Sequence, residues 1–234
     1  MSDPVPGGRK KGGKYPVSTS LFWEELYTLL EETYGPQKCF LEHSSAFELL
    51  VATILSAQCT DKRVNMVTRT LFAHASTPEE FARLSREELE KWIHSCGFYR
   101  AKAEHILAAS RKIVSDFHGE LPSSMEELTS LPGVGRKTAN VVLADFFGVP
   151  GFPVDTHVIR LTGNFGIGTD DPVKIEEKVS ALFPFPEKLG ELSHLLIMHG
   201  RSCCKAGNPD CASCCLRGRF CKGKTEKKKR NRTK

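Results

Sequence analysis

Residues 131–140 read Leu131-Pro132-Gly133-Val134-Gly135-Arg136-Lys137-Thr138-Ala139-Asn140, and this segment indicates the type of fold. Its two glycines flank one apolar residue, which predicts a tight turn with outward-facing backbone N–H groups. Residues 124–128 predict a short helix before the turn, and residues 137–148 predict a second helix that ends at Gly148. The segment therefore predicts a helix–hairpin–helix whose exposed N–H groups suit a phosphate.

Helical signals continue through the rest of the chain. Serine, threonine or aspartate precedes several apolar patterns of helical period, as at capped helix starts. The expected helices cover residues 21–34, 46 to about 58, 101–117, 156–164, 172–183 and 189–201, and others start near 61, 78 and 86. The helix from 46 is apolar nearly all round, which is typical of a core helix. No period-two strand pattern occurs, so we expect an all-α protein.

Composition limits the class of protein. A chain of 234 residues with 40% hydrophobic content is long enough for one large domain or two small ones. No apolar run approaches the roughly 18 residues of a membrane span, and residues 1–14 do not resemble a secretory signal. We therefore expect a cytoplasmic protein (nucleoid-associated if bacterial), in which nine cysteines favour metal or cluster ligation over disulfides.

Charge is concentrated at the two ends of the chain. Residues 1–20 carry +3 and residues 222–234 carry +7, whereas the whole chain carries +5, so the remainder carries −5. Basic arms of this kind add sequence-independent attraction to DNA phosphates, although a passive solubilising tail has the same composition. Charge therefore permits a nucleic-acid partner without requiring one.

Two motifs and a cysteine cluster follow one another in an order and with spacings that are typical of one protein family. The hairpin motif, followed by Val154-Asp155-Thr156-His157-Val158, resembles the endonuclease III branch of the helix–hairpin–helix DNA glycosylase family over residues of about 18–223. The hairpin alone also occurs in non-enzymatic clamps on the DNA backbone, which is the alternative for this motif. The resemblance implies an all-α, two-lobed fold with a six-helix bundle and a cluster-containing lobe. The implied parts are a basic arm (1–17), an N-terminal helix packed on the C-terminal lobe (18–38), the six-helix domain (39–149), the cluster-containing lobe (150–223) and a basic disordered tail (224–234).

Lys137 is the predicted nucleophile. A lysine attacks carbon only as the neutral amine, and a helix N-terminus and the adjacent cation of Arg136 both disfavour the ammonium form. The resemblance implies that this amine forms a Schiff base with C1′ of the deoxyribose. The alternative is a simple phosphate contact by Lys137. Gly133, Gly135, Arg136 and Thr138 are the expected DNA-binding residues of the hairpin.

Asp155 is the predicted partner of Lys137. It follows an extended segment and precedes a helix, as an N-cap does, and backbone N–H bonds favour an ionised carboxylate. The resemblance implies that this charge stabilises the cationic sugar as the base leaves. The alternative is a plain helix cap. Asp145 lies eight residues beyond Lys137, roughly 12 Å along a helix, and is interpreted as structural, like His157.

Two loops are expected to occupy the gap that a flipped nucleotide leaves in the duplex. The segment 55–61 resembles the family loop whose glutamine enters the DNA, which makes Gln58 the candidate. The segment 97–103 resembles the loop that supplies an apolar wedge, and Phe98 stands where the family often has leucine. The alternative for Phe98 is an aromatic core residue at a helix end.

Six of the nine cysteines lie between residues 203 and 221. Cys204, Cys211, Cys214 and Cys221 have the spacing C-x6-C-x2-C-x6-C, whereas the family usually has C-x6-C-x2-C-x5-C around a 4Fe–4S cluster. Cys215 is the alternative third ligand, and zinc is the less favoured alternative metal. The centre is expected to brace a loop that meets the DNA backbone.

The predicted function is base-excision repair by a monomeric, bifunctional DNA glycosylase with AP lyase activity. It removes oxidised pyrimidines from duplex DNA that contains damaged bases or abasic sites, through a Schiff base and β-elimination. The alternatives are a monofunctional glycosylase and a non-enzymatic helix–hairpin–helix DNA-binding protein.

Overall fold

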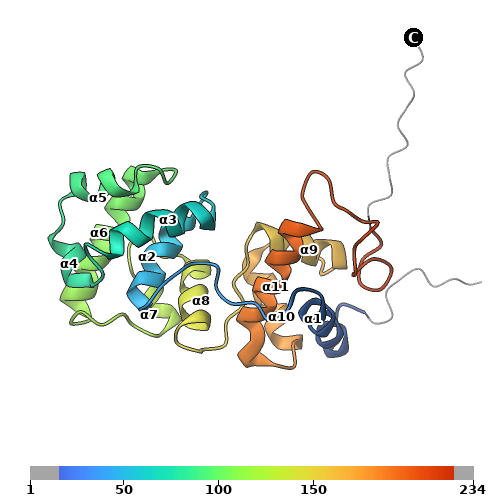
Figure 1. Cartoon of the computed structure of the whole chain (residues 1–234). Coiled ribbons are helices and arrows are strands. Elements are labelled where there is room, and N and C mark those ends of the chain that lie inside the picture. Colours follow the sequence, from blue (N-terminus) through green and yellow to red (C-terminus); the bar gives the residue numbers. More distant parts are fainter. Residues whose placement is uncertain (1–15, 224–234) are drawn as a thin grey trace, which may run out of the picture. The chain divides into compact units, whose positions relative to one another are not determined.

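The computed structural model describes residues 16–223, in which all regular secondary structure is helical (Figure 1). They contain no β-strand, and their one β-bridge is an isolated contact between Arg217 and Cys221. The predicted all-α class is therefore confirmed. Within the same range, no helix combines the length and the hydropathy that a membrane crossing requires. The two predicted basic arms lie almost wholly outside the described residues.

The chain forms two compact units. Unit 1 takes in the chain up to residue 36, residues 155–184 and the chain from residue 195, and unit 2 takes in residues 37–154 and 185–194. One helix, α11 (Leu189–Ser202), contributes residues to both units. Lys137 belongs to unit 2 and Asp155 belongs to unit 1.

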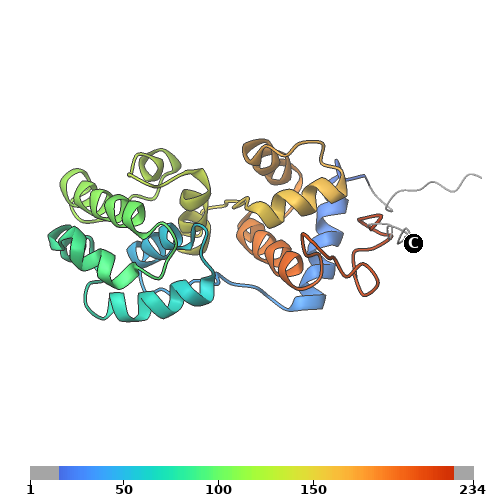
Figure 2. The same cartoon turned by 90° about the horizontal axis from the view of Figure 1, so that it is seen from above.

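Unit 2 is built around α2, of which ten of the eleven residues are buried. This confirms the prediction of a core helix in this segment. Helices α3, α6 and α8 all contact α2 (Figures 1 and 2). The helices of this unit are α2 (Ala46–Ser56), α3 (Asp61–Phe72), α4 (Pro78–Arg83), α5 (Arg86–Ile93), α6 (Tyr99–Asp116), α7 (Met125–Thr129) and α8 (Arg136–Asp145), with the 3₁₀ turn η1 (Pro186–Lys188) before α11.

Unit 1 contains α1 (Ser20–Tyr34), α9 (Thr156–Phe165), α10 (Pro172–Leu182) and the C-terminal part of α11. A cluster of edge-to-face aromatic rings forms its centre. The ring centroid of Phe22 lies 5.3 Å from that of Trp23, 5.8 Å from Phe165 and 5.2 Å from Phe220. Because Phe220 lies in the cysteine-rich segment after α11, this cluster fixes that segment to α1 and α9.

Several helix ends differ from the predicted ones. The helix expected to reach residue 58 ends at Ser56, because Ala57 leaves the helical region and Gln58 has a φ of +52°. The helix expected from 101 starts at Tyr99, directly after Phe98, whose φ is +57°. The helix expected to start near residue 86 does so and ends at Ile93. Helices α4 and α5 start where predicted, and each start has a complete capping box, whereas at the start of α2 the Ser45 side chain accepts from the Glu48 amide without a reciprocal bond to its own amide.

The hairpin between α7 and α8 lies where predicted, although α8 ends at Asp145 and not at the predicted Gly148. Leu131 and Val134 are buried, and the Val134 amide donates to the Leu131 carbonyl over 3.1 Å. Gly133 has a φ of +75°, and a Cβ at this position would lie 2.6 Å from the Cβ of His105 on α6. The turn therefore requires glycine at 133 both for its backbone conformation and for the close approach of α6.

We expect Gly133→Ala to lower the free energy of unfolding by about 1–3 kcal/mol, because alanine adds both backbone strain and a clash with His105. Gly135→Ala is the matched control in the same hairpin: its φ is −93° and nothing lies within 4 Å of an added Cβ. It should cost at most about 1 kcal/mol, as an alanine N-cap does. Urea unfolding measures both variants, and equal costs would contradict this account of the turn.

Candidate functional site

Lys137 lies in the first turn of α8 with its side chain exposed. Gly135 is the N-cap of α8, and no side chain caps this helix. The first-turn amides of Lys137 and Thr138 are therefore donors that an anion could use, beside the exposed side chains of Arg136 and Lys137. Thr138, half-buried, completes the turn. The structure thus places all the predicted hairpin residues on one continuous surface of unit 2.

Asp155 is the N-cap of α9, as predicted. Its Oδ1 accepts hydrogen bonds from the amides of His157 (2.8 Å) and Val158 (2.9 Å). Among the described residues no donor contacts Oδ2, so the half-buried carboxylate presents one oxygen to a ligand. Two backbone donors stabilise negative charge on this group. Because Lys137 and Asp155 belong to different units, their proximity stays a prediction.

The segment before Asp155 is held on the side of unit 2. Phe152 is fully buried, and the Ser193 hydroxyl donates to the Pro153 carbonyl over 2.6 Å. Asp145, the other acid considered, pairs with His194 through Oδ1 and Nε2 at 2.8 Å, and both side chains are buried. This pairing agrees with the structural interpretation of Asp145.

His157 also has structural partners. Its Nδ1 lies 3.1 Å from Nη2 of Arg160, and the same guanidinium nitrogen donates to the carbonyls of Gly200 (3.1 Å) and Cys204 (2.7 Å). Burial lowers the pKa of His157 from its ordinary value. Arg160 therefore connects the start of α9 with the beginning of the cysteine-rich segment, a connection that the sequence did not indicate.

Gln58 and Phe98 lie on two neighbouring loops of unit 2. Both side chains are exposed, and that of Phe98 is 68% accessible, so it is not the core residue considered as the alternative. A Cβ on Gly97 would lie 3.4 Å from the Gln58 carbonyl oxygen, which shows that the loops touch. The structure brings these two predicted residues together, and their roles on DNA stay predictions.

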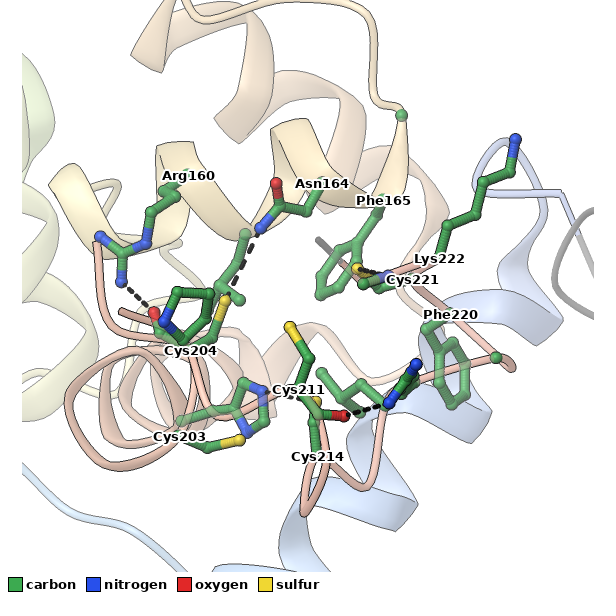
Figure 3. A pocket seen from close by; sticks show the side chains of 18 of the residues that line it. Arg160, Asn164, Phe165, Cys203, Cys204, Cys211, Cys214, Phe220, Cys221 and Lys222 are labelled. Atoms are coloured by element: carbon green, nitrogen blue, oxygen red, sulfur yellow. Dashed lines mark hydrogen bonds between the residues drawn. The ribbon is translucent and has the colours of Figure 1, made fainter. Parts of the chain in front are cut away.

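Five of the six C-terminal cysteines line one pocket of unit 1. Figure 3 shows the sulfur atoms of Cys204, Cys211 and Cys221 pointing into the same space. The four predicted ligands and Cys203 belong to this lining, whereas Cys215 does not. His199, Cys203 and Cys214 also offer ligand atoms within 4.8 Å of one another, so the described residues include a group that could hold a metal.

Three of the four predicted ligands have a nitrogen near their sulfur. Asn164 Nδ2 lies 3.6 Å from the Cys204 sulfur, and His199 Nε2 lies 3.5 Å from the Cys214 sulfur. The Gly223 amide donates to the Cys221 sulfur over 3.2 Å. Donors of this kind stabilise thiolates at metal centres. The donor set therefore fits a bound cluster.

The pKa values of the cysteines and of His199 reflect burial. Burial raises the pKa of Cys203 to about 12 and raises those of Cys204 and Cys214, and a bound cation would oppose this effect. Burial, helped by the charge of Arg160, lowers the pKa of His199 to about 4. The hydroxyl oxygen of Tyr34 lies 2.8 Å from Nδ1 of His199. If the Tyr34 hydroxyl donates to Nδ1, a neutral His199 carries its proton on Nε2 and can donate it to the Cys214 sulfur.

The comparisons with known proteins agree with this geometry. Residues 51–185 match the model of the HhH-GPD superfamily base excision DNA repair proteins. The chain is 48% identical to an endonuclease III of Synechocystis sp. over 194 residues, which covers 82% of this chain and 88% of the relative. It is 47% identical to an endonuclease III of Bacillus subtilis over 76% of this chain and 82% of the relative.

Solved structures give the same result. The chain resembles the protein in a solved structure of a trapped covalent endonuclease III–DNA intermediate, with 40% sequence identity and a TM-score of 0.80. The match covers 85% of this chain and 93% of that one. A thermostable thymine-DNA glycosylase, 21% identical with a TM-score of 0.71 over 87% and 95% of the chains, shares the fold.

The cap at Asp155 gives a stability prediction. Asp155→Ala removes the acceptor for two amides and should lower the free energy of unfolding by about 0.5–2 kcal/mol. Asp155→Asn should stay within a few tenths of a kcal/mol of wild type, since asparagine caps helices about as well as aspartate. Chemical denaturation at neutral pH measures both. An asparagine variant as unstable as the alanine variant would show that the cap is not what Asp155 contributes.

Proposed function

Because the chain belongs to the HhH-GPD superfamily of base excision DNA repair proteins, in its endonuclease III branch, we propose that it excises oxidised pyrimidines from duplex DNA and then cleaves the abasic strand. It is a bifunctional DNA glycosylase with AP lyase activity. Its partner is duplex DNA with damaged bases or abasic sites. The observation that carries the proposal is the similarity to an enzyme captured in a covalent intermediate with DNA, because such a bond requires a nucleophile.

Lys137 is that nucleophile in this proposal. Its position supports the role, because it is exposed in the first turn of α8, directly behind a hairpin whose free amides suit a DNA phosphate. A phosphate held by Gly133, Gly135 and the start of α8 would set the distance between the amine and the sugar. Positioning of this kind removes much of the entropic part of the barrier.

The proposed reaction passes through an imine between the Lys137 nitrogen and C1′ of the sugar. The lone pair of the Lys137 amine bonds to C1′ while the C1′–base bond breaks, and the base leaves with that electron pair and takes up a proton. The amine nitrogen loses a proton, its lone pair forms a double bond to C1′, and the C1′–O4′ bond breaks with its electron pair going to O4′, which takes up a proton; the product is the protonated imine. Removal of a C2′ proton forms a new double bond, the C3′–O bond breaks and the 3′ phosphate leaves. Water then hydrolyses the imine and returns the amine.

Asp155 provides negative charge in this scheme. Its Oδ1 is held by two amides, so Oδ2 is the oxygen that would face the sugar and stabilise the cation that develops at C1′. The same carboxylate would accept the proton that the amine loses. Gln58 and Phe98, exposed on adjacent loops, would fill the space that the extruded nucleotide leaves.

The cysteine pocket is proposed to hold a 4Fe–4S cluster through Cys204, Cys211, Cys214 and Cys221. The nitrogen donors at three of these sulfurs and the absence of Cys215 from the pocket lining support this set over the one with Cys215. The cluster would cross-link residues 203–223, a segment that follows the last helix and contains no helix of its own. Lys205, Arg217, Arg219 and Lys222 supply positive charge on this segment.

Borohydride trapping on a duplex with one oxidised pyrimidine tests the function. Wild type should become covalently linked to the DNA, and Lys137→Gln should give no trapped complex because it has no amine. Asp155→Asn, which keeps the helix cap, should slow excision by about 10²- to 10³-fold. Arg136→Gln is the neighbouring control: it should bind more weakly but still trap. Trapping of Lys137→Gln at the wild-type level would refute the assignment, and no trapping by wild type would favour a monofunctional or binding-only protein.

Metal analysis tests the centre. We expect iron and a brown visible absorbance in wild type, a large loss of both in Cys214→Ser, and retention of both in Cys215→Ser. The two serine variants differ by one position in the same segment, so they form a matched pair. Stoichiometric zinc in a colourless protein would exclude the cluster, and iron loss confined to Cys215→Ser would make Cys215 the third ligand.

A further inference from the structure

Lys102 is a buried lysine for which the proposed reaction has no role. Its residue is only 5% exposed, and it is the one lysine that is buried among residues 16–223. Its Nζ donates to two backbone carbonyls, Leu55 O at 2.8 Å and Ala57 O at 2.6 Å. A buried amine has a high desolvation cost, so a lysine is placed there only with partners that offset it.

These two carbonyls lie at the C-terminal end of α2, the core helix of unit 2. The last carbonyls of a helix have no partner within the helix, and the negative end of the helix dipole favours a cation there. Burial lowers the pKa of Lys102, but the ammonium and the neutral amine can each donate both bonds. Lys102 thus caps α2 from a different helix, α6, in either protonation state.

The two loops that meet at Lys102 hold strained residues. Among residues 16–223 only three non-glycine residues have a positive φ, and two of them are Gln58 (+52°) and Phe98 (+57°). Such conformations are costly for non-glycine residues and persist only where the surrounding contacts hold them.

Lys102 bonds to a peptide group adjacent to each strained residue. The Ala57 carbonyl belongs to the same peptide plane as the Gln58 nitrogen, so the bond to Nζ fixes the plane that sets φ of Gln58. The backbone amide of Lys102 donates to the Phe98 carbonyl over 3.2 Å and fixes the plane after Phe98. The Lys102 side chain therefore holds the Gln58 loop, and its backbone amide makes the first helical bond after Phe98. The Phe98 loop rests on the Gln58 loop, since a Cβ on Gly97 would lie 3.4 Å from the Gln58 carbonyl oxygen.

We propose that Lys102 is a positioning residue for base extrusion, which holds the Gln58 loop and the Phe98 loop in the one arrangement that enters DNA. The inference rests on the proposed function, because it requires that these two side chains fill the duplex. Preorganised loops enter the base stack without first ordering themselves, so their loss slows only the steps that need a base pair to be opened.

The test compares two substrates in the full-length protein. Lys102→Met keeps a straight side chain and removes both hydrogen bonds. We expect its kcat/KM for a damaged base in duplex DNA to fall on the order of 10- to 100-fold. Its lyase activity on a single-stranded abasic oligonucleotide, which has no base pair to open, should stay within about twofold of wild type. Lys112→Met is the control on the same helix, because Lys112 pairs only with the exposed Asp116 and both activities should be unchanged.

A spectroscopic signature supports the same comparison. With 2-aminopurine placed opposite the lesion, wild type should raise its fluorescence on binding as the base loses its stacking partner, and Lys102→Met should raise it much less. If the methionine variant does not fold, Lys102→Gln replaces it, since the amide can donate to one of the two carbonyls and should give an intermediate loss.

Two results would overturn the inference. Equal loss of duplex excision and single-strand lyase activity would mean that Lys102 only supports the fold, and unchanged duplex excision would mean that the loops do not need it. Both are distinguishable from failure of the proposed function, in which wild type itself would neither excise nor trap.

Discussion

The close contact between Gly133 and His105 is the constraint on which the proposed DNA-binding part of unit 2 depends. No Cβ fits between the hairpin and α6, so the turn lies directly against that helix. One turn earlier on α6, Lys102 holds the end of α2, and at the start of α6 the backbone of Phe98 is fixed. Residues 98, 102 and 105 follow helical spacing, so a single face of α6 sets both the hairpin and the two loops.

A common frame of this kind matters for a base-excision enzyme. Such an enzyme must hold a phosphate, extrude a nucleotide and bring an amine to C1′. Displacements of about 1 Å in such groups lower the reaction rate strongly. In unit 2 the amides at the start of α8 and the two exposed loops are parts of one packed helical core, with α2 at its centre. Asp155 is placed by a different device, since its carboxylate is fixed by the N-terminus of the helix that it caps.

Local features could be predicted from the sequence, whereas contacts between distant segments could not. The hairpin glycines, the caps at Thr77 and Ser85 and the cap at Asp155 all depend on residues within a few positions of one another, and the structure has them. The helix end at Ser56 was missed, because the left-handed Gln58 is held through Ala57 by Lys102, which is distant in sequence. The helix start at Tyr99 was missed, because its N-cap, Phe98, has no capping side chain.

For the cysteine pocket, too, the local spacing could be predicted, whereas the contacts from distant segments could not. The spacing indicated four ligands, but it could not show that Cys203 also lines the pocket or that Asn164 and His199 approach the sulfurs, because those residues come from α9 and α11. A signal for Lys102 did exist: it stands on the otherwise apolar face of α6 that includes Ile106 and Ile113. A lysine in such a stripe indicates a buried partner but does not say which one.

The central claim is that one amine, that of Lys137, bonds to the sugar. The most direct measurement is to reduce the complex of wild-type protein and damaged duplex with borohydride, digest it and locate the nucleotide remnant by mass spectrometry. This account predicts a single modified residue, Lys137. Attachment to any other amine, with Lys137 unmodified, would contradict it.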